Sequence, residues 1–283
     1  IENTQFIKNL EKDKEQIIET EKKTLAEERA VETARMEKVL SETSQKQVAL
    51  EAETEAVKER LEAEIKTHLN ISYWQFTNCC TDSLQIAFHA FCAIGDTVIV
   101  PAYGWRAIVN APKLMGLNII YCDIDETGNL DINQAVELIH KHQPSAILVV
   151  HNFGTLVDVA ELTDVCAKYN VAIIEDAAPS FTMGEPYEYE LGTFSDAVCF
   201  SFDFTKSPGC LGAGGAIATN DPLNYERFKT ICSHTTSDWG VGTKSYLDTT
   251  SAAVLLKEIQ LIKQNNYRKK KVEIATYYLN NLP

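Results

Sequence analysis

The chain has 283 residues, of which 45% are hydrophobic and 23% are charged, and its formal net charge is -14. This length and composition predict one large folded domain with a smaller additional part. The acidic balance argues against a nucleic-acid partner or an anionic membrane, because both favour a basic protein surface. No apolar run is long enough to span a membrane, and the amino terminus lacks a signal-peptide pattern, so we expect a cytoplasmic protein.

The eight cysteines are scattered through apolar segments, with no CxxC pair and no compact group of cysteine and histidine. This spacing is typical of reduced cysteines that pack as small hydrophobic side chains. The sequence therefore predicts no metal site.

Residues 1–66 contain neither glycine nor proline and are rich in Glu, Lys, Ala and Leu, which favour helix. Apolar residues such as Leu10, Ile17, Leu25, Leu50 and Leu61 recur with broken heptad spacing. We favour a helical arm that forms a coiled coil or binds a helical partner. The alternative is a solvated, partly disordered charged tail.

From residue 70 onward, short apolar runs alternate with helical patterns. The expected strands cover residues 97–101, 117–122, 146–151, 171–175, 197–201 and 215–219. The expected helices cover residues 82–92, 105–114, 132–142, 157–169, 223–234 and 250–280. Apolar runs with little alternation indicate strands that are buried on both faces. The pattern therefore predicts an α/β fold with a mainly parallel sheet, in which ligands bind at the carboxyl ends of the strands.

Several candidate functional residues follow these strands. Thr81 and Ser83 lie where a helix begins, so they could bind a phosphate or act as an ordinary helix cap. Trp105 could lie against a flat ligand ring or pack in the core. His151 ends a strand and could move a proton, although we favour a structural or cofactor-orienting role.

Asp176 and Lys206 are the most informative pair. Asp176 ends an apolar strand, where an unpaired carboxylate is costly to bury unless a cation lies beside it, and Lys206 follows the next strand. Pyridoxal phosphate (PLP) requires such a pair: the amine forms a Schiff base, and the carboxylate keeps the pyridine nitrogen protonated. Taken alone, Lys206 could equally be a surface lysine in a glycine-rich loop.

Seven segments occur in an order that resembles the DegT/DnrJ/EryC1/StrS family of PLP-dependent sugar aminotransferases. They cover residues 80–84, 95–103, 122–125, 150–154, 174–178, 201–206 and 214–219. The resemblance implies the aspartate aminotransferase-like fold type I, with a seven-stranded sheet in a PLP-binding domain over residues 67–250. The arm would cover residues 1–66, and residues 251–283 would begin an incomplete carboxy-terminal domain.

The resemblance also implies roles for individual residues. Lys206 would bond to PLP, Asp176 would pair with the pyridine nitrogen, and Trp105 would stack on the ring. Thr81, Asp82 and Ser201 would contact the phosphate region. A homodimer with active sites at the subunit interface is expected.

The chain departs from the family pattern at several positions. Cys80 stands where the family usually has glycine, Pro179 replaces Gln or His, and Ala213 replaces Glu. Residues 242–246 replace the usual Gly-x-Asn-x-Arg, so we predict that Lys244 contacts the phosphate from the neighbouring subunit.

The expected function is therefore transfer of an amino group from an amino acid, with glutamate favoured, to a nucleotide-linked keto sugar. Dehydratases of the same group carry histidine at the lysine position, so Lys206 argues against that reaction. The alternative from another class is a non-catalytic structural or assembly protein that retains the fold and uses the arm as its working part.

Overall fold

The computed structural model describes residues 2–181, 190–233 and 242–282. His234, the predicted end of one helix, and Pro283 lie outside the described residues. The chain divides into two compact units, Ile1–Glu55 and Ala56–Pro283. The domain boundaries expected at residues 66 and 250 stay a prediction.

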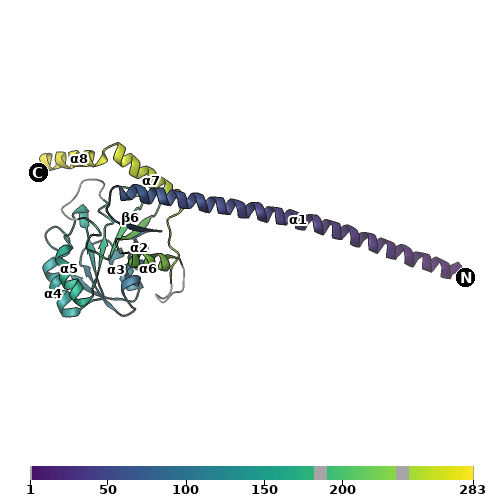
Figure 1. The fold of residues 1–283 in the computed structure, drawn as a ribbon, viewed down its shortest axis with the longest axis horizontal. Coiled ribbons are helices and arrows are strands. Elements are labelled where there is room, and N and C mark those ends of the chain that lie inside the picture. Colours follow the sequence, from purple (N-terminus) through teal and green to yellow (C-terminus); the bar gives the residue numbers. More distant parts are fainter. Residues whose placement is uncertain (1, 182–189, 234–241, 283) are drawn as a thin grey trace. The chain divides into compact units, whose positions relative to one another are not determined.

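The predicted long amino-terminal helix is confirmed as α1 (Glu2–Lys66) (Figure 1). Along the part that belongs to the first unit, several threonine hydroxyls donate to the carbonyl four residues earlier. These are Thr20, Thr24, Thr33, Thr43 and Thr54. Large apolar side chains are exposed on the same stretch, namely Leu25, Val31, Met36, Val39, Leu40, Val48 and Leu50.

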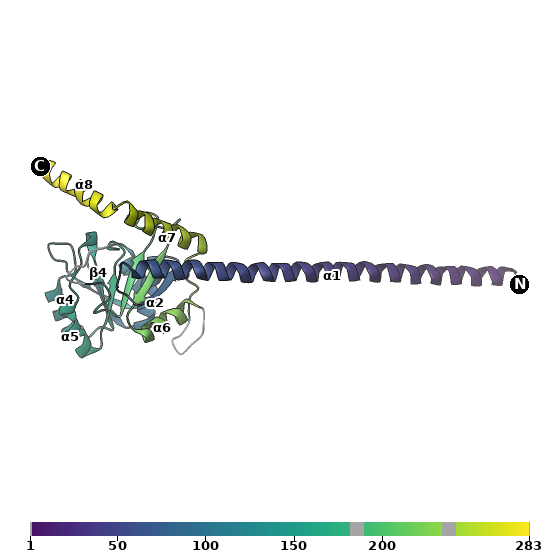
Figure 2. The same cartoon turned by 45° about the horizontal axis from the view of Figure 1, so that its top comes forward.

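The second unit is built on a seven-stranded sheet, as expected for fold type I (Figure 2). Its strands are β1 (Tyr73–Thr77), β2 (Thr97–Pro101), β3 (Asn118–Cys122), β4 (Ala146–Val150), β5 (Ala172–Asp176), β6 (Ala197–Ser201) and β7 (Gly215–Thr219). They lie in the order β1-β7-β6-β5-β4-β2-β3. Strand β7 runs antiparallel to both of its neighbours, and the pairs from β6 to β3 are parallel.

Helices cover both faces of this sheet, which explains the continuous apolar strands. One face packs against α2 (Cys80–Phe91), α3 (Ala107–Leu114) and α6 (Pro222–Cys232). The other packs against α4 (Ile132–His142), α5 (Ala160–Tyr169), α7 (Thr249–Gln264) and the end of α1. Alternate residues of β4 enter the two cores, with Leu148 on the first face and Val149 on the second.

The end of α1 belongs to the core of the second unit. Leu61 and Ile65 are fully buried, in the same cluster as Leu255 and Ile259 of α7. The stabilisation expected from burying such side chains is about 1.5–3 kcal/mol each. Residues 56–66 are therefore part of this folded unit.

Two features of the fold differ from the sequence prediction. Strand β1 was not predicted, because Tyr73, Gln75 and Thr77 make its pattern more polar than that of the central strands. The helical stretch expected over residues 250–280 is divided into α7 and α8 (Tyr267–Asn281) at Asn266, whose φ is 50°. Asparagine tolerates this left-handed conformation better than most residues.

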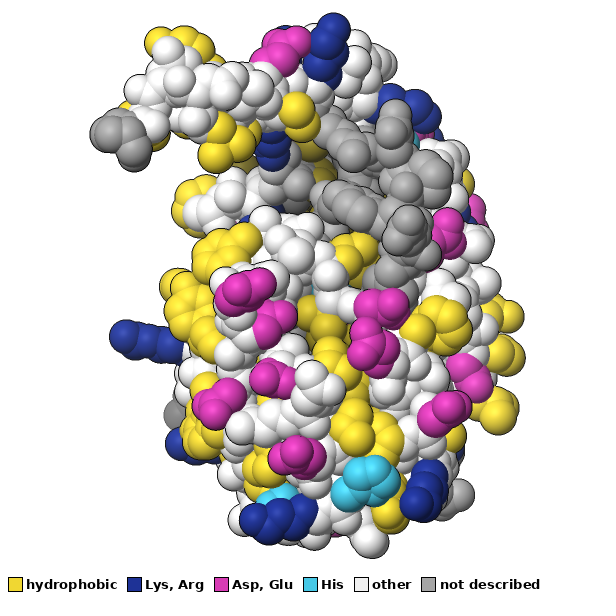
Figure 3. All heavy atoms as spheres, turned by 90° about the vertical axis from the view of Figure 1, so that its left-hand side faces the viewer, with side chains coloured by type: hydrophobic (Ala, Val, Ile, Leu, Met, Phe, Trp, Pro, Cys, Tyr) yellow, Lys and Arg dark blue, Asp and Glu magenta, His cyan; other side chains and the backbone are white. Residues whose placement is uncertain are grey.

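The surface agrees with the acidic composition. On the face shown in Figure 3, acidic side chains are widely spread and basic ones lie mainly toward the edges. Among the described residues, no helix is long and apolar enough to cross a membrane. All eight cysteines are free, and five of them are buried.

Candidate functional site

A cavity of about 400 Å³ lies at the carboxyl ends of the parallel strands, where ligands bind in sheets of this kind. The start of α2, the ends of β4, β5 and β6, and the loops that follow β2 and β6 supply its walls. The lining residues that bear on chemistry are Cys80, Thr81, Trp105, Asn152, Asp176, Ser201, Thr205 and Lys206. The cavity thus brings together five of the seven predicted site residues: Thr81, Trp105, Asp176, Ser201 and Lys206.

Asp176 is the last residue of β5 and is only 4% exposed. Its Oδ1 accepts a hydrogen bond from the Ala178 N–H at 2.9 Å, whereas Oδ2 accepts none from the described residues. Burial raises the pKa of Asp176, although Ala178, His151 and Lys206 act in the opposite direction. A buried carboxylate with a free oxygen facing a cavity is suited to bind a cation or a protonated ring nitrogen.

Lys206 lies in a tight loop that follows β6. Asp203 Oδ1 accepts hydrogen bonds from the Thr205 N–H at 3.0 Å and from the Thr205 hydroxyl at 2.6 Å. The Lys206 N–H donates to the Asp203 carbonyl at 2.8 Å, which closes the turn. A Cβ atom at Gly209 would lie 2.9 Å from the carbonyl oxygens of both Asp203 and Lys206, so the loop requires glycine there. These contacts hold the half-buried lysine at the cavity wall.

The amino terminus of α2 forms another part of the wall. Aspartates cap α4, α6 and α7, but α2 begins after Cys79 without a side-chain cap. Its first N–H groups can therefore donate to an anion, and the helix dipole favours negative charge there. Gly215 permits this position of the helix, because a Cβ atom at residue 215 would lie 2.4 Å from the Cys79 carbonyl carbon.

Trp105 and Ser201 also line the cavity. The Trp105 side chain is 80% exposed and comes from the loop after β2, so it is available to cover a flat ligand. Ser201 ends β6, is 8% exposed and presents its hydroxyl near the lysine loop.

Asp82 and Lys244 are not among the residues that line the cavity. Asp82 accepts hydrogen bonds from the Ser245 hydroxyl at 2.7 Å and from the Cys79 thiol at 3.4 Å. It thereby ties the start of α2 to the segment at residues 242–248. Lys244 is exposed, and its Nζ lies 5.4 Å from the centre of the Tyr246 ring. Their predicted phosphate contacts stay predictions.

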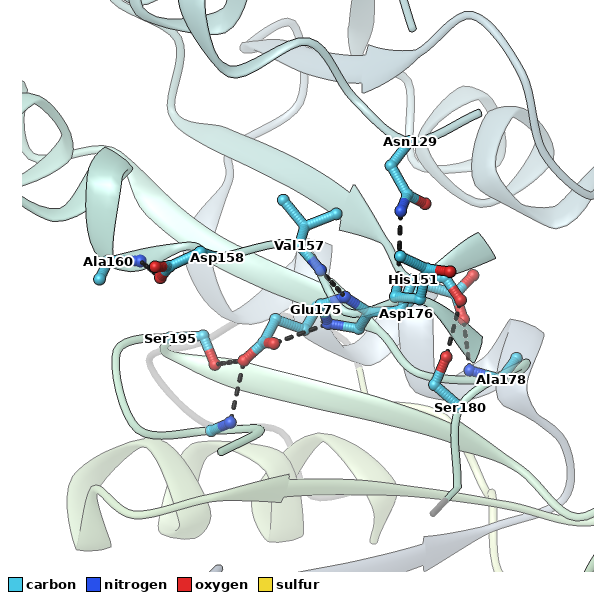
Figure 4. A network of polar contacts seen from close by, with 12 residues as sticks. Asn129, His151, Val157, Asp158, Ala160, Glu175, Asp176, Ala178, Ser180 and Ser195 are labelled. Carbon is cyan, nitrogen blue, oxygen red and sulfur yellow. Dashed lines mark hydrogen bonds and ion pairs between the residues drawn. The ribbon is translucent and has the colours of Figure 1, made fainter. Parts of the chain in front are cut away.

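His151 does not line the cavity; it follows β4 and pairs with Glu175 of β5 in the buried core (Figure 4). Its Nδ1 accepts from the Val157 N–H at 3.1 Å, and its Nε2 lies 2.7 Å from Glu175 Oε2. Gly192 N–H donates to the other oxygen of Glu175 at 2.9 Å, and the Ser195 hydroxyl also donates to it. Burial alone would raise the pKa of Glu175, but these hydrogen bonds outweigh it and lower that pKa. The structural role favoured for His151 agrees with this geometry.

Of the eight lining residues that bear on chemistry, sequence reasoning missed three: Cys80, Asn152 and Thr205. Each is next to a residue that was singled out, since Cys80 precedes Thr81, Asn152 follows His151 and Thr205 precedes Lys206. Asn152 and Thr205 also follow predicted strands, whereas the strand before Cys80 was not predicted. Asn152 is held by the amide of Asn129, which accepts its N–H at 2.8 Å. Within the described ranges, no group of three or more His, Cys, Asp or Glu side chains could hold a metal ion.

The chain is similar to known sugar aminotransferases. UDP-2-acetamido-2-deoxy-3-oxo-D-glucuronate aminotransferase from Pseudomonas aeruginosa is 35% identical over 68% of this chain and 55% of that protein. 3-Oxo-glucose-6-phosphate:glutamate aminotransferase from Bacillus subtilis is 28% identical over 79% of this chain and 51% of that protein. The chain thus spans about half the length of these relatives.

Solved structures show the same fold. DesV from S. venezuelae superposes with a TM-score of 0.69 and 28% identity, over 83% of this chain and 69% of that one. NtdA from Bacillus subtilis, solved with bound cofactor PMP, also has a TM-score of 0.69 and 28% identity, over 79% of this chain and 52% of that one. The DegT/DnrJ/EryC1/StrS aminotransferase family model matches residues 29–283. The chain therefore belongs to the DegT/DnrJ/EryC1/StrS aminotransferase family.

Proposed function

We propose that this protein is a PLP-dependent aminotransferase that transfers an amino group from an amino acid to a nucleotide-linked keto sugar. The observation that carries this proposal is the cavity shared by Asp176, Lys206 and the uncapped start of α2. The names of the Pseudomonas and Bacillus relatives support a sugar acceptor, and the Bacillus name supports glutamate as the donor.

The residues of the cavity suit PLP chemically. The buried carboxylate of Asp176 has a free oxygen for a protonated pyridine nitrogen, and the first N–H groups of α2 can bind a phosphate. Lys206 supplies the amine, and Trp105 is exposed at the wall, where its ring could cover a flat cofactor. When bound, PLP supplies an electron sink and the carbonyl that accepts the amino group.

Each residue then has a distinct task. Lys206 Nζ would hold the cofactor and would carry a proton as base and acid. Asp176 would hold the pyridine nitrogen in its charged form, and Thr81 and Ser201 would hold the phosphate. Because Lys244 is exposed and lies outside the cavity lining, we propose that it reaches the phosphate of a second subunit in a homodimer.

The test uses absorbance and mass spectrometry. Protein given PLP should develop an absorption band near the edge of the visible range, and borohydride should fix the cofactor onto Lys206. Lys206→Ala should lose both signals, whereas Lys269→Ala, which changes an exposed lysine of α8, should keep them. Covalent labelling that persists in Lys206→Ala would refute the assignment.

A second candidate function is assembly through the arm, favoured by the exposed apolar side chains of α1 between Leu25 and Leu50. We propose that the arm pairs with a helical partner, either a second copy or another protein. The two functions are separable, because assembly through the arm requires no cofactor. Size measurement of the protein with and without the arm therefore tests assembly, and PLP labelling tests catalysis.

A further inference from the structure

Cys80 is the first residue of α2, and its thiol lies beside the buried carboxylate of Asp176. The Sγ atom is 3.9 Å from Asp176 Oδ1, and both residues line the cavity. The backbone of Cys80 has little freedom to move, because a Cβ atom at Gly215 would lie 2.6 Å from the Cys80 nitrogen. Strand β7 and the start of α2 thus fix where this thiol lies.

The hydrogen bond has a defined direction. Burial raises the pKa of the Cys80 thiol well above its usual range, and the charge of Asp176 raises it further. The thiol therefore keeps its proton and donates it, while the carboxylate accepts. The other titratable groups near Asp176 are Lys206 and His151, which lower its pKa, and Cys199, whose thiol burial keeps neutral.

Both protein donors reach the same carboxylate oxygen. The Ala178 N–H donates to Asp176 Oδ1 from the chain that follows β5, and the Cys80 thiol approaches Oδ1 from α2. Two donors from different elements restrict rotation of the carboxylate about its Cβ–Cγ bond. The other oxygen, Oδ2, is left without a donor from the described residues and belongs to a side chain that lines the cavity.

We propose that Cys80 is a positioning residue for Asp176, holding Oδ1 so that Oδ2 faces the pyridine nitrogen of the cofactor. This inference rests on the proposed binding of PLP. Cys80 makes no covalent bond in this role. It acts through Asp176 by orienting the carboxylate and by stabilising its ionised form.

The test measures PLP affinity as a function of pH by absorbance, without any substrate. Removing the donor with Cys80→Ala should weaken PLP binding by about three- to tenfold, the factor expected for one ordinary hydrogen bond, because a thiol is a weak donor even to a charged acceptor. Loss of the donor raises the pKa of Asp176. When the pH is lowered, the variant should therefore lose PLP binding at a pH about half a unit to one unit higher than the wild-type protein does. Cys80→Ser keeps a donor and should retain both the affinity and the pH profile.

Two further variants make the result decisive. Cys92→Ala removes a cysteine that does not line the cavity and should leave the titration unchanged. Cys80→Gly removes the donor in a second way, in case alanine disturbs the helix start. If wild-type protein binds PLP and both donor-free variants titrate like it, the role of Cys80 is refuted. If wild-type protein itself fails to bind PLP, the proposed function fails instead.

Discussion

His151 Nε2 lies 2.7 Å from Glu175 Oε2, and solvent reaches neither side chain. Since Nδ1 accepts the Val157 N–H, the imidazole proton is on Nε2 and is donated to the carboxylate. Consecutive strand residues face opposite sides of a sheet, so Glu175 is anchored in the core while Asp176 faces the cavity. The pair thereby fixes the end of β5, which carries the residue that we assign to the cofactor.

Replacing Glu175 by glutamine should destabilise the protein. The glutamine side chain keeps one oxygen and replaces the other by an N–H₂ group, which would face either the His151 Nε2–H or the Gly192 N–H. One of these two buried donors would then have no acceptor. The expected cost is about 1–3 kcal/mol in the free energy of unfolding, measured by urea denaturation at pH 7. Glu226→Gln is the matched control, because Glu226 forms an exposed pair with Lys229 and the change should alter stability by less than about 1 kcal/mol.

The same substitution should show a characteristic pH dependence. The pKa of Glu175 is lowered in the folded protein. Its contribution to folding stability is therefore fully present above its pKa in the unfolded chain, about 4.3, and is lost as the pH falls through its pKa in the folded protein. The difference in the free energy of unfolding between wild-type protein and Glu175→Gln should therefore shrink below about pH 4. A difference that stays constant down to pH 3 would contradict this account.

Asp176→Asn should separate stability from cofactor binding. The pKa of Asp176 is raised by burial, so its ionised form lowers the stability of the folded protein when the pH is above its pKa in the unfolded chain, about 3.9. Without cofactor at pH 7, the variant should melt a few degrees higher, about 2–4 °C for each kcal/mol gained. PLP binding should be weakened strongly, because asparagine cannot hold the pyridine nitrogen protonated.

The control for this experiment is Asp164→Asn, which changes an exposed aspartate of α5. It should alter neither the melting temperature nor PLP affinity. A melting temperature for Asp176→Asn below that of the wild type would mean that the carboxylate stabilises the empty site.

Gly215→Ala should displace the start of α2. The added Cβ would meet backbone atoms of Cys79 and Cys80 at 2.4–2.7 Å, and backbone cannot move aside as a flexible side chain can. We expect a loss of about 1–3 kcal/mol in stability together with at least tenfold weaker PLP binding. Gly95→Ala provides the comparison: its φ of 91° makes alanine strained, but it does not line the cavity, so only stability should fall.

Truncation should reveal where the arm ends and the second unit begins. A protein that starts at Ala56 keeps Leu61 and Ile65, whereas one that starts at Thr67 loses both from the core. Removing such buried side chains costs about 2–5 kcal/mol each, so only the longer protein should remain fully folded by circular dichroism and bind PLP. Equal melting temperatures for the two proteins would show that the end of α1 contributes nothing to the core.

Much of the fold was predictable from local patterns. The apolar runs of β2, β4, β6 and β7 have strand length and no alternation, which indicates burial on both faces. Helix α4 was predicted with its observed bounds, and its Asp131 cap is a local signal. Strand β1 was missed because Tyr73, Gln75 and Thr77 give it a mixed pattern, whereas β3, the other edge strand, has an apolar run and was predicted.

The sequence by itself determined the α/β alternation, the long helix without glycine or proline, and the presence of Asp176 and Lys206 after buried strands. These features follow from hydrophobic periodicity and composition, which can be read from a short stretch of sequence. Only the tertiary structure decided that Cys80 reaches Asp176, that Asp82 bonds to Ser245 and that His151 pairs with Glu175. Those contacts join residues 24 to 163 positions apart, so they depend on how the strands are ordered in the sheet and on how closely glycine lets the elements approach.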